Sequence, residues 1–401
     1  MRAITLPHTG ERIDISYLTS LHIKAYDRDN LYPQRMSDLI NASSTGRACL
    51  DRYARFIEGG GLNDVKLSEI DAAEDTPLDE VVSAISRDLA RFGGFALHVN
   101  WGVAEDGYKV TSLSPIPFDR CRLVEDDDAG YVGRIAVHPD WRGKRTRGGR
   151  TLRVSADTID YFPRFNPRQE VLQAQIFAAG GIDYYKGQIL WVSSAGANTY
   201  PLPKYDSVAT ELSADEGLSN VKFRNVRNNF LPSCIFLSRQ SQSLNNDDPQ
   251  SDDDFFKEVS NGYAKTLEQF QGDMRSNNIL HLTVGANEMP PEIKEFPVKN
   301  FDKDFEVTDR SVVERIYCAF EQEPFLSIRN GKLGFSGDVI QDAYNFYSAL
   351  VYKEQRMIER ALSRVLSHWH DAASVARGDF SIKPLVYSSG KDEVTTTNDE
   401  L

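Results

Sequence analysis

The sequence has little cysteine, and its cysteines are far apart. Only four occur in 401 residues, at Cys49, Cys121, Cys234 and Cys318, and no two of them form a CxxC pair. Zinc sites and the disulfide frameworks of small secreted domains need closely spaced cysteines. The spacing therefore favours buried, reduced thiols, and we expect neither a metal nor a cofactor.

Long apolar runs are missing as well. No stretch reaches the roughly 18 consecutive apolar residues that are needed to cross a bilayer. The first residues, MRAITLPHTGERIDIS, lack the apolar segment of a secretory signal. The sequence therefore predicts a soluble chain that is made in a cytoplasm and has no membrane partner.

Nucleotide-binding and catalytic motifs are absent or incomplete. No GxxxxGK[ST] motif occurs, and GFSGD at 334–338 departs from the G-x-S-x-G nucleophile pattern at its last position. HWHD at 368–371 is the most metal-like cluster. On a helix, however, His368 and His370 would point to different faces, whereas helical ligand pairs are three or four residues apart. We expect no enzymatic activity, and a metal-dependent hydrolase that uses His368, His370 and Asp371 is the alternative.

Positive charge is in deficit. The chain has 46 lysines and arginines against 59 aspartates and glutamates, which gives a formal net charge of −13. A protein that grips DNA phosphates usually carries a surplus of cations, so tight DNA binding is not expected. The exception is WRGKRTRGGR at 141–150, which could contact phosphate or an acidic protein surface. The alternative for this segment is an exposed hairpin loop whose charge is balanced by the acidic DDDAG turn.

The length predicts more than one packed region, and the residue patterns predict an α+β fold. Apolar residues at helical spacing predict a helix over 31–61 with a break near Ser43–Gly46. A second helix is predicted with Thr76 as its N-cap and Gly93 at its end. Residues 92–195 are predicted to be mostly β. Strands are expected at FALHVNWG, TLRVSAD, TIDYFPRF and GQILWVSS, with a hairpin around DDDAG.

Long helices dominate the second half of the sequence. They are predicted over 206–230, 253–275 and 338–370, and a shorter helix is predicted to start at Thr308 and Asp309. Strands are predicted at SCIFLS, NILHLTV and FSIKPLVY. The segment EPFLSIRNGKLGFSG, which contains three glycines, is predicted to be a loop. The first two long helices have narrow apolar faces and polar flanks, so each needs neighbouring helices to bury its apolar residues.

The order of these elements resembles that of the phage portal protein family. YPLP at 200–203 leads into the first long helix, and NNFLP at 228–232 ends it, which is similar to the entry and exit of a portal stem helix. ERIYCAFEQEPFL at 314–326 resembles the portal stretch in which a helix ends in a phenylalanine and a proline before a loop. The likeness covers residues 31–387 and lacks the long C-terminal crown of the family.

The resemblance implies a portal-like fold with an α/β wing, a two-helix stem, a small clip insertion and a long C-terminal helix toward a short crown. The implied segments are an N-terminal arm (1–30), a wing of helices and mostly β structure (31–205), stem helix 1 (206–230), a clip (231–252), stem helix 2 (253–275), a wing strand and helix (276–322), a tunnel loop (323–337), the long helix with a small crown (338–387) and a disordered tail (388–401).

The resemblance also implies which residues carry function. Tunnel-loop residues would touch the DNA backbone, clip residues would dock other proteins, and stem residues would line the channel or meet neighbouring subunits. These residues are Arg329, Asn330 and Lys332 in the tunnel loop; Arg239, Gln240, Asn245, Asp247 and Asp248 in the clip; and Lys222, Arg224 and Arg227 in the stem.

The implied function is that of a non-enzymatic subunit of a ring of twelve copies at one capsid vertex of a virion, assembled in the host cytoplasm. The implied partners are the major capsid protein, the large terminase subunit, a head-tail adaptor, and double-stranded DNA that passes through the channel without sequence specificity. A negatively charged wall suits this passage because like charges keep DNA from sticking. Another virion structural protein, such as a minor head or adaptor protein, is the alternative.

Overall fold

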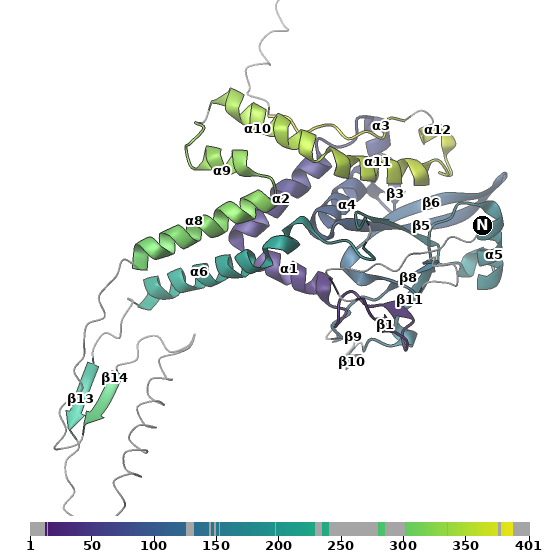
Figure 1. Ribbon diagram of the computed structural model, residues 1–401. Helices are drawn as coiled ribbons and strands as arrows, with labels where there is room; N and C mark the ends of the chain where they lie inside the picture. The colour runs from purple at the N-terminus through teal and green to yellow at the C-terminus, as the bar shows by residue number, and fades with distance from the viewer. Residues whose placement is uncertain are drawn as a thin grey trace, which may run out of the picture. The chain divides into compact units, whose positions relative to one another are not determined.

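The computed structural model describes residues 13, 15–125, 132–143, 146–147, 150–151, 153–196, 198–228, 235–239, 280–284, 301–334, 336–375 and 378–387 (Figure 1). The chain divides into two units. The first unit combines Met1–Ser213 with Val312–Leu401, and the second unit, Ala214–Ser311, is inserted between these two parts. The described residues form helices and sheets in both, so the fold is α+β as predicted.

The first unit begins with two helices that meet at Ser43. Helix α1 (Tyr32–Ala42) and helix α2 (Ser44–Glu58) are separated by this one extended residue. The Ser43 hydroxyl accepts a hydrogen bond from the backbone N–H of Gly46 at 2.9 Å and so caps α2. The predicted interruption near Ser43–Gly46 is therefore confirmed.

Helix α4 (Leu78–Phe92) follows the short helix α3 (Val65–Ser68). It ends as predicted at Gly93, which adopts the left-handed conformation and caps the helix. The predicted start is wrong by one residue, because Pro77 and not Thr76 is the N-cap. Thr76 instead lies in strand β4 (Thr76–Pro77), which pairs with β3 (Asp71–Ala73).

Two three-stranded antiparallel sheets follow, as the sequence predicts for 92–195. The first sheet has the order β12-β5-β6, and the second has the order β11-β8-β7. The predicted hairpin is the pair β7 and β8. The bounds are β5 (Gly94–Ala104), β6 (Gly107–Ile116), β7 (Cys121–Leu123), β8 (Arg134–Val137), β11 (Asp160–Pro163) and β12 (Gln188–Ser193), with the 3-10 turn η1 (Phe118–Arg120) between β6 and β7.

Two features of this β region differ from the prediction. Among the described residues of TLRVSAD only Thr151 is strand, in the pair β9 (Thr146–Arg147) and β10 (Arg150–Thr151). Helix α5 (Gln169–Ala179) was not predicted. Its residues are apolar on most sides, so the sequence lacks the one-sided pattern that marks a surface helix.

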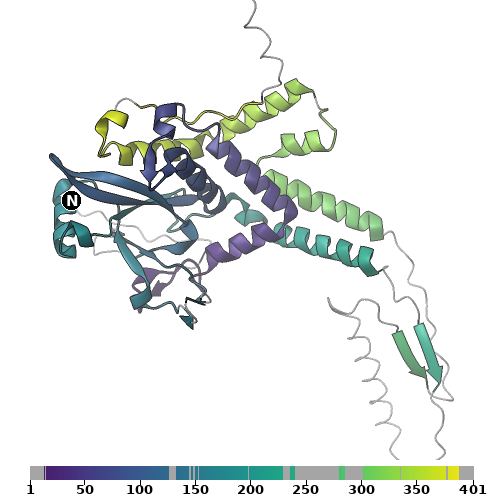
Figure 2. The same ribbon diagram turned by 180° about the vertical axis from the view of Figure 1, so that it is seen from behind.

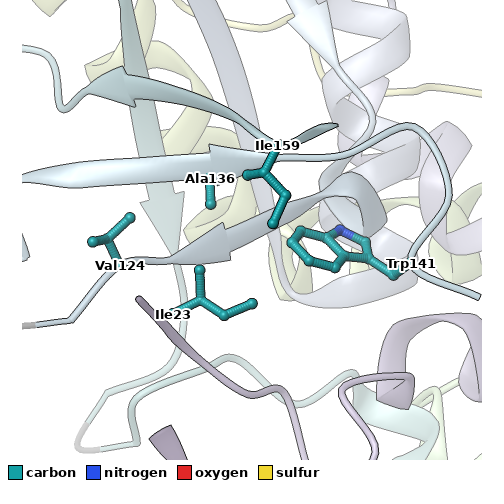
Figure 3. Close-up of a cluster of buried hydrophobic side chains, with 5 residues drawn as sticks. All are labelled: Ile23, Val124, Ala136, Trp141 and Ile159. Carbon is teal, nitrogen blue, oxygen red and sulfur yellow. The ribbon is translucent and has the colours of Figure 1, made fainter. Parts of the chain in front are cut away.

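A buried apolar cluster joins the start of the chain to the second sheet (Figure 3). Ile23 comes from β2 (Ile23–Lys24), which pairs with β1 (Tyr17–Leu18). Its side chain packs with those of Val124, Ala136, Trp141 and Ile159, all of which are buried. The first described residues are therefore fixed to the β region by apolar contact.

The C-terminal helices of the first unit are α9 (Glu323–Arg329), α10 (Gly337–Leu350), α11 (Tyr352–Leu366) and α12 (Ala372–Val375). Helix α11 packs against α2 and α4 (Figure 1 and Figure 2). The single helix predicted over 338–370 is wrong, because the chain breaks at the fully buried Val351 and again after Leu366.

The strand predicted for FSIKPLVY is reduced to one bridge. Residues 378–387 run beside the end of α2, where Ile382 bridges Leu62. The Gly60 N–H donates to the Lys383 carbonyl at 2.8 Å. Gly59 has a φ of 63°, and a Cβ added there would collide with the same carbonyl oxygen, so this close approach requires glycine.

The described residues of the inserted second unit form parts of two helices and one pair of strands. Helix α6 (Ala209–Asn228) and helix α8 (Phe301–Ala319) cross the boundary between the units. The predicted strands are confirmed as β13 (Ile235–Arg239) and β14 (Leu280–Val284), which pair in parallel. Helix α8 starts at Phe301, not at Thr308 as predicted.

The helix predicted over 253–275 and the tail 388–401 lie outside the described residues. None of the helices in the described part is long and apolar enough to cross a membrane.

Candidate functional site

Helices α6 and α8 lie side by side, and two ion pairs connect them. Within the first unit, Arg315 donates to the carboxylate of Glu211 at 2.8 Å. Within the second unit, the ammonium of Lys222 lies 2.8 Å from the carboxylate of Asp309. The hydrogen bond from Arg315 lowers the pKa of Glu211. Such exposed pairs contribute at most about 1 kcal/mol each, so they fix how the helices align more than they stabilise the fold.

This pairing gives the first long helix a neighbour that was not predicted. Helix 206–230 was predicted to pair with 253–275, but among the described residues its neighbour is α8. Likewise, strand 280–284 was predicted to belong to the wing, but it pairs with β13. The chain therefore leaves the first unit along α6 and returns to it along α8.

The predicted stem and clip residues fall at the edge of the described structure. Lys222 is exposed on α6 and paired with Asp309. Arg224 and Arg227 belong to α6, and Arg239 ends β13, but their side chains lie outside the description. The remaining clip residues, Gln240, Asn245, Asp247 and Asp248, also lie outside the described residues.

The loop predicted over 323–337 is partly helical. Its first half is α9, with Pro324 in the first turn, where the missing N–H of proline costs nothing. Arg329 is the last residue of this helix and donates a hydrogen bond to the Tyr317 hydroxyl at 3.4 Å. This bond raises the pKa of Arg329. Asn330 is the C-cap.

Residues 329–334 form a compact exposed turn, which we call the α9–α10 turn. Its backbone is hydrogen-bonded: Asn330 donates to Leu326 at 2.9 Å, and Lys332 donates to Ser327 at 2.9 Å. All six residues are exposed, including the apolar Leu333. The turn thus presents Arg329, Asn330 and Lys332 together on a hydrogen-bonded backbone, and their predicted role in a tunnel loop stays a prediction.

The α9–α10 turn is anchored by the fully buried Gln322, the N-cap of α9. Its amide nitrogen donates to the carbonyl of Cys49 at 2.9 Å and to the Tyr347 hydroxyl at 2.8 Å. Its amide oxygen accepts from Arg52 at 2.8 Å. The Tyr347 hydroxyl in turn donates to the carbonyl of Phe320 at 2.9 Å. Gln322 therefore connects α2, α8, α9 and α10.

Aromatic rings complete this anchor. Phe325 of α9 packs against Phe56 of α2 and against Tyr344 and Tyr347 of α10, with ring centroids 5.6 to 5.9 Å apart. The Arg52 guanidinium lies 4.8 Å from the Phe325 ring centroid. Burial raises the pKa of the Tyr347 hydroxyl, which remains protonated and able to donate. Sequence reasoning missed this cluster because its members come from three separate segments, in α2, α9 and α10.

A second buried polar node supports the β region. The Arg122 guanidinium is fully buried and donates to neutral oxygens of Asn30, Gln34, Asp119 and Cys121 at 2.6 to 3.2 Å. Burial lowers the pKa of Arg122. The segment DRCRL gives no sequence signal that the second arginine is internal, because arginine is usually exposed.

In the structure, His370 and Asp371 of the HWHD segment contact the protein backbone. The His370 imidazole Nδ1 lies 3.2 Å from the Val110 carbonyl oxygen, and the Asp371 carboxylate accepts from the backbone N–H of Ala373 at 3.1 Å. Burial lowers the pKa of His368. In the part of the chain that the structure describes, no three histidine, cysteine or acidic side chains are arranged to hold a metal ion.

No protein-family model and no curated protein matches this sequence. Among the solved structures similar to this chain is one from the virion of a native gene transfer agent particle. It is 15% identical, covers 86% of this chain and 82% of its own, and has a TM-score of 0.45.

Two further similar chains come from necks of gene transfer agent particles, one native and computed with C12 symmetry, the other empty and computed with C6 symmetry. Both are 14% identical with a TM-score of 0.43. The first covers 84% of this chain and 81% of its own, and the second covers 86% and 83%. At this identity and these TM-scores, the similarity assigns neither a family nor a function to this chain.

Proposed function

We propose that the chain is a portal subunit of a phage-type virion: one of about twelve copies in a ring at a capsid vertex, through which DNA enters and leaves. The observation that carries this proposal is the inserted second unit. The chain leaves the first unit along α6, forms the strand pair β13 and β14, and returns along α8. A portal stem and clip are built with this connectivity.

In this proposal the stem is α6 with α8, and the clip is the segment between them. This assignment replaces 253–275 as the second stem helix and places both strands in the clip. The exposed cation Lys222 is paired with Asp309, so the helix pair offers little free positive charge at that position. A stem of this kind fits a channel that DNA must pass without binding tightly.

The α9–α10 turn is proposed to be the tunnel loop that touches the DNA backbone. Arg329 and Lys332 are exposed, and the turn is fixed to the first unit by Gln322 and Phe325. Two cations on a chain with a net charge of −13 would contact phosphates without reading bases.

The proposed partners are identical subunits, the major capsid protein, the large terminase subunit, a head-tail adaptor and double-stranded DNA.

A double variant tests the role of the turn. Replacing Arg329 and Lys332 with Ala should reduce the amount of DNA packaged or retained per particle, because the backbone contacts are lost, while the ring still assembles. The matched control removes two exposed cations of α11 (Lys353→Ala with Arg360→Ala) and should leave packaging unchanged. Equal packaging by the two double variants would remove the turn from the DNA path.

A further inference from the structure

A pocket of about 340 Å³ opens between the two three-stranded sheets of the first unit. Its walls come from β5 and β6 of one sheet, β8 and β11 of the other, and η1 between them. This volume falls in the range of small-ligand sites. The pocket contains no residue of the α9–α10 turn or of α6 and α8, so its role is independent of the proposed portal function.

Most of the pocket wall is apolar. Pro115, Pro117 and Pro139 lie in it, and proline has no N–H to offer, so these positions present carbon surface and no backbone donor. Ile116 and the ring of Phe162 add further apolar surface. A ligand with an apolar body would therefore lose water from both surfaces on entering.

Among the charged and titratable side chains that the structure describes in the pocket wall, only that of Arg120 is available to bind a ligand. The Asp160 carboxylate accepts from the Lys186 ammonium at 2.7 Å. The His98 Nε2 lies 2.6 Å from the Lys186 carbonyl oxygen, so this nitrogen carries the hydrogen and is occupied. The Arg120 guanidinium, by contrast, has no hydrogen-bond or ion-pair partner in the described part of the chain.

The backbone that carries Arg120 is held firmly. The Phe118 N–H donates to the Asp88 carboxylate at 2.9 Å, which ties η1 to α4. The Arg120 carbonyl accepts from the His138 N–H at 3.1 Å and from the Trp141 indole N–H at 2.8 Å. A ligand would therefore order only the side chain of Arg120, which keeps the entropic cost of binding low.

We propose that this pocket binds an organic carboxylate with an apolar body. The carboxylate accepts two parallel hydrogen bonds from the Arg120 guanidinium, the geometry that arginine offers to carboxylates. The apolar body lies against the prolines and Phe162. The carboxylate belongs either to a free small acid or to an acidic residue beside an aromatic one in a peptide.

The first arm of the test uses 3-phenylpropionate as the free acid and 3-phenylpropanamide as its neutral isostere. The full chain is titrated with the acid, and binding is measured by calorimetry and by the NMR chemical shifts of backbone amides near Ile116 and Phe162. Saturable binding of the acid is expected. The amide should bind about tenfold to a hundredfold more weakly, because the charged hydrogen bonds are lost. Arg120→Gln should weaken binding of the acid by a similar factor.

Two further variants separate the pocket from general effects of charge and folding. Arg134→Gln removes an exposed cation of β8 that lies outside the pocket and should leave the affinity unchanged. Ser114→Leu keeps Arg120 but fills the pocket, and it should abolish binding.

The second arm of the test uses a blocked peptide with adjacent Phe and Asp residues. Tighter binding of the peptide than of the acid would identify the source of the carboxylate as a protein partner. Lack of saturable binding by either probe, or full binding by Arg120→Gln, would overturn the proposal.

Discussion

At the scale of single residues, buried polar side chains fix the positions from which exposed ones act. Gln322 shows this most directly, because its amide satisfies the Cys49 carbonyl, the Tyr347 hydroxyl and the Arg52 guanidinium at once. Each of these groups would lose this hydrogen bond if the amide were removed. A buried polar group that loses its partner costs about 1 to 3 kcal/mol.

Gln322→Ala should therefore lower the free energy of unfolding by about 2 to 4 kcal/mol. Urea denaturation measures this change. Lys332→Ala, at an exposed position of the α9–α10 turn, is the control and should change stability by less than about 0.5 kcal/mol. Similar losses for the two variants would show that the Gln322 network does not anchor the turn.

Asp88 is a second residue whose burial has a measurable effect. Burial, together with the nearby Asp119, raises the pKa of the Asp88 carboxyl to about 7, although the Phe118 N–H, Arg91 and Arg87 act in the opposite direction. The pKa is thus higher in the folded protein than in the unfolded chain. The protonated form favours folding below the unfolded pKa, and this contribution is lost as pH rises through the folded value.

Asp88→Asn imitates the protonated acid and can still accept from the Phe118 N–H. The variant should be more stable than the parent chain at about pH 8, and the difference should shrink as pH falls toward about 5. Denaturation at both values checks this, with Glu80→Gln on the exposed face of α4 as the control. A variant that is less stable than the parent at both values would contradict the assignment.

At the scale of helices and strands, local sequence predicted much of the structure. The break near Ser43–Gly46, the stop at Gly93 and the strand β5 follow from neighbouring residues, and all three predictions are confirmed. The break at Val351 was missed because no glycine or proline marks it. There, packing of a buried side chain decides the backbone, and the helical spacing continues through the break.

In the candidate site, too, local sequence predicted some features, and contacts between distant residues decided the others. The sequence located Arg329, Asn330 and Lys332 in one exposed segment, but it could not show that α9 precedes them or that Gln322 holds them. Partners such as Cys49 and Tyr347 are distant in sequence, so no local pattern reveals them. The pairing of α6 with α8 was missed for the same reason, since the two helices are separated by the whole insertion.

Glycine positions provide a test at this scale. Gly59→Ala should destabilise the first unit by more than about 1 kcal/mol, because φ is positive and the Cβ would meet the Lys383 carbonyl. Gly217→Ala, within α6 and with open space around its Cα, should stabilise by about 0.5 to 1 kcal/mol. Amide exchange of 378–387 should rise only in the Gly59 variant. Changes of the same sign in both variants would contradict the docking of this segment.

At the scale of the whole molecule, the chain combines the helix pair of α6 and α8, an anchored cationic turn and a strong negative net charge. Each subunit carries a formal charge of −13, so a ring of copies would surround its axis with negative charge. Such a ring repels DNA along most of its surface and leaves contact to a few cations. The polar flanks of α6 and α8 would then meet neighbouring subunits around a closed, head-to-tail ring.

Native mass spectrometry of the purified chain tests this claim most directly. If the proposed ring forms, we expect a closed assembly with a mass near twelve times that of the 45.2 kDa subunit. A chain that stays a 45.2 kDa monomer at high concentration would contradict it.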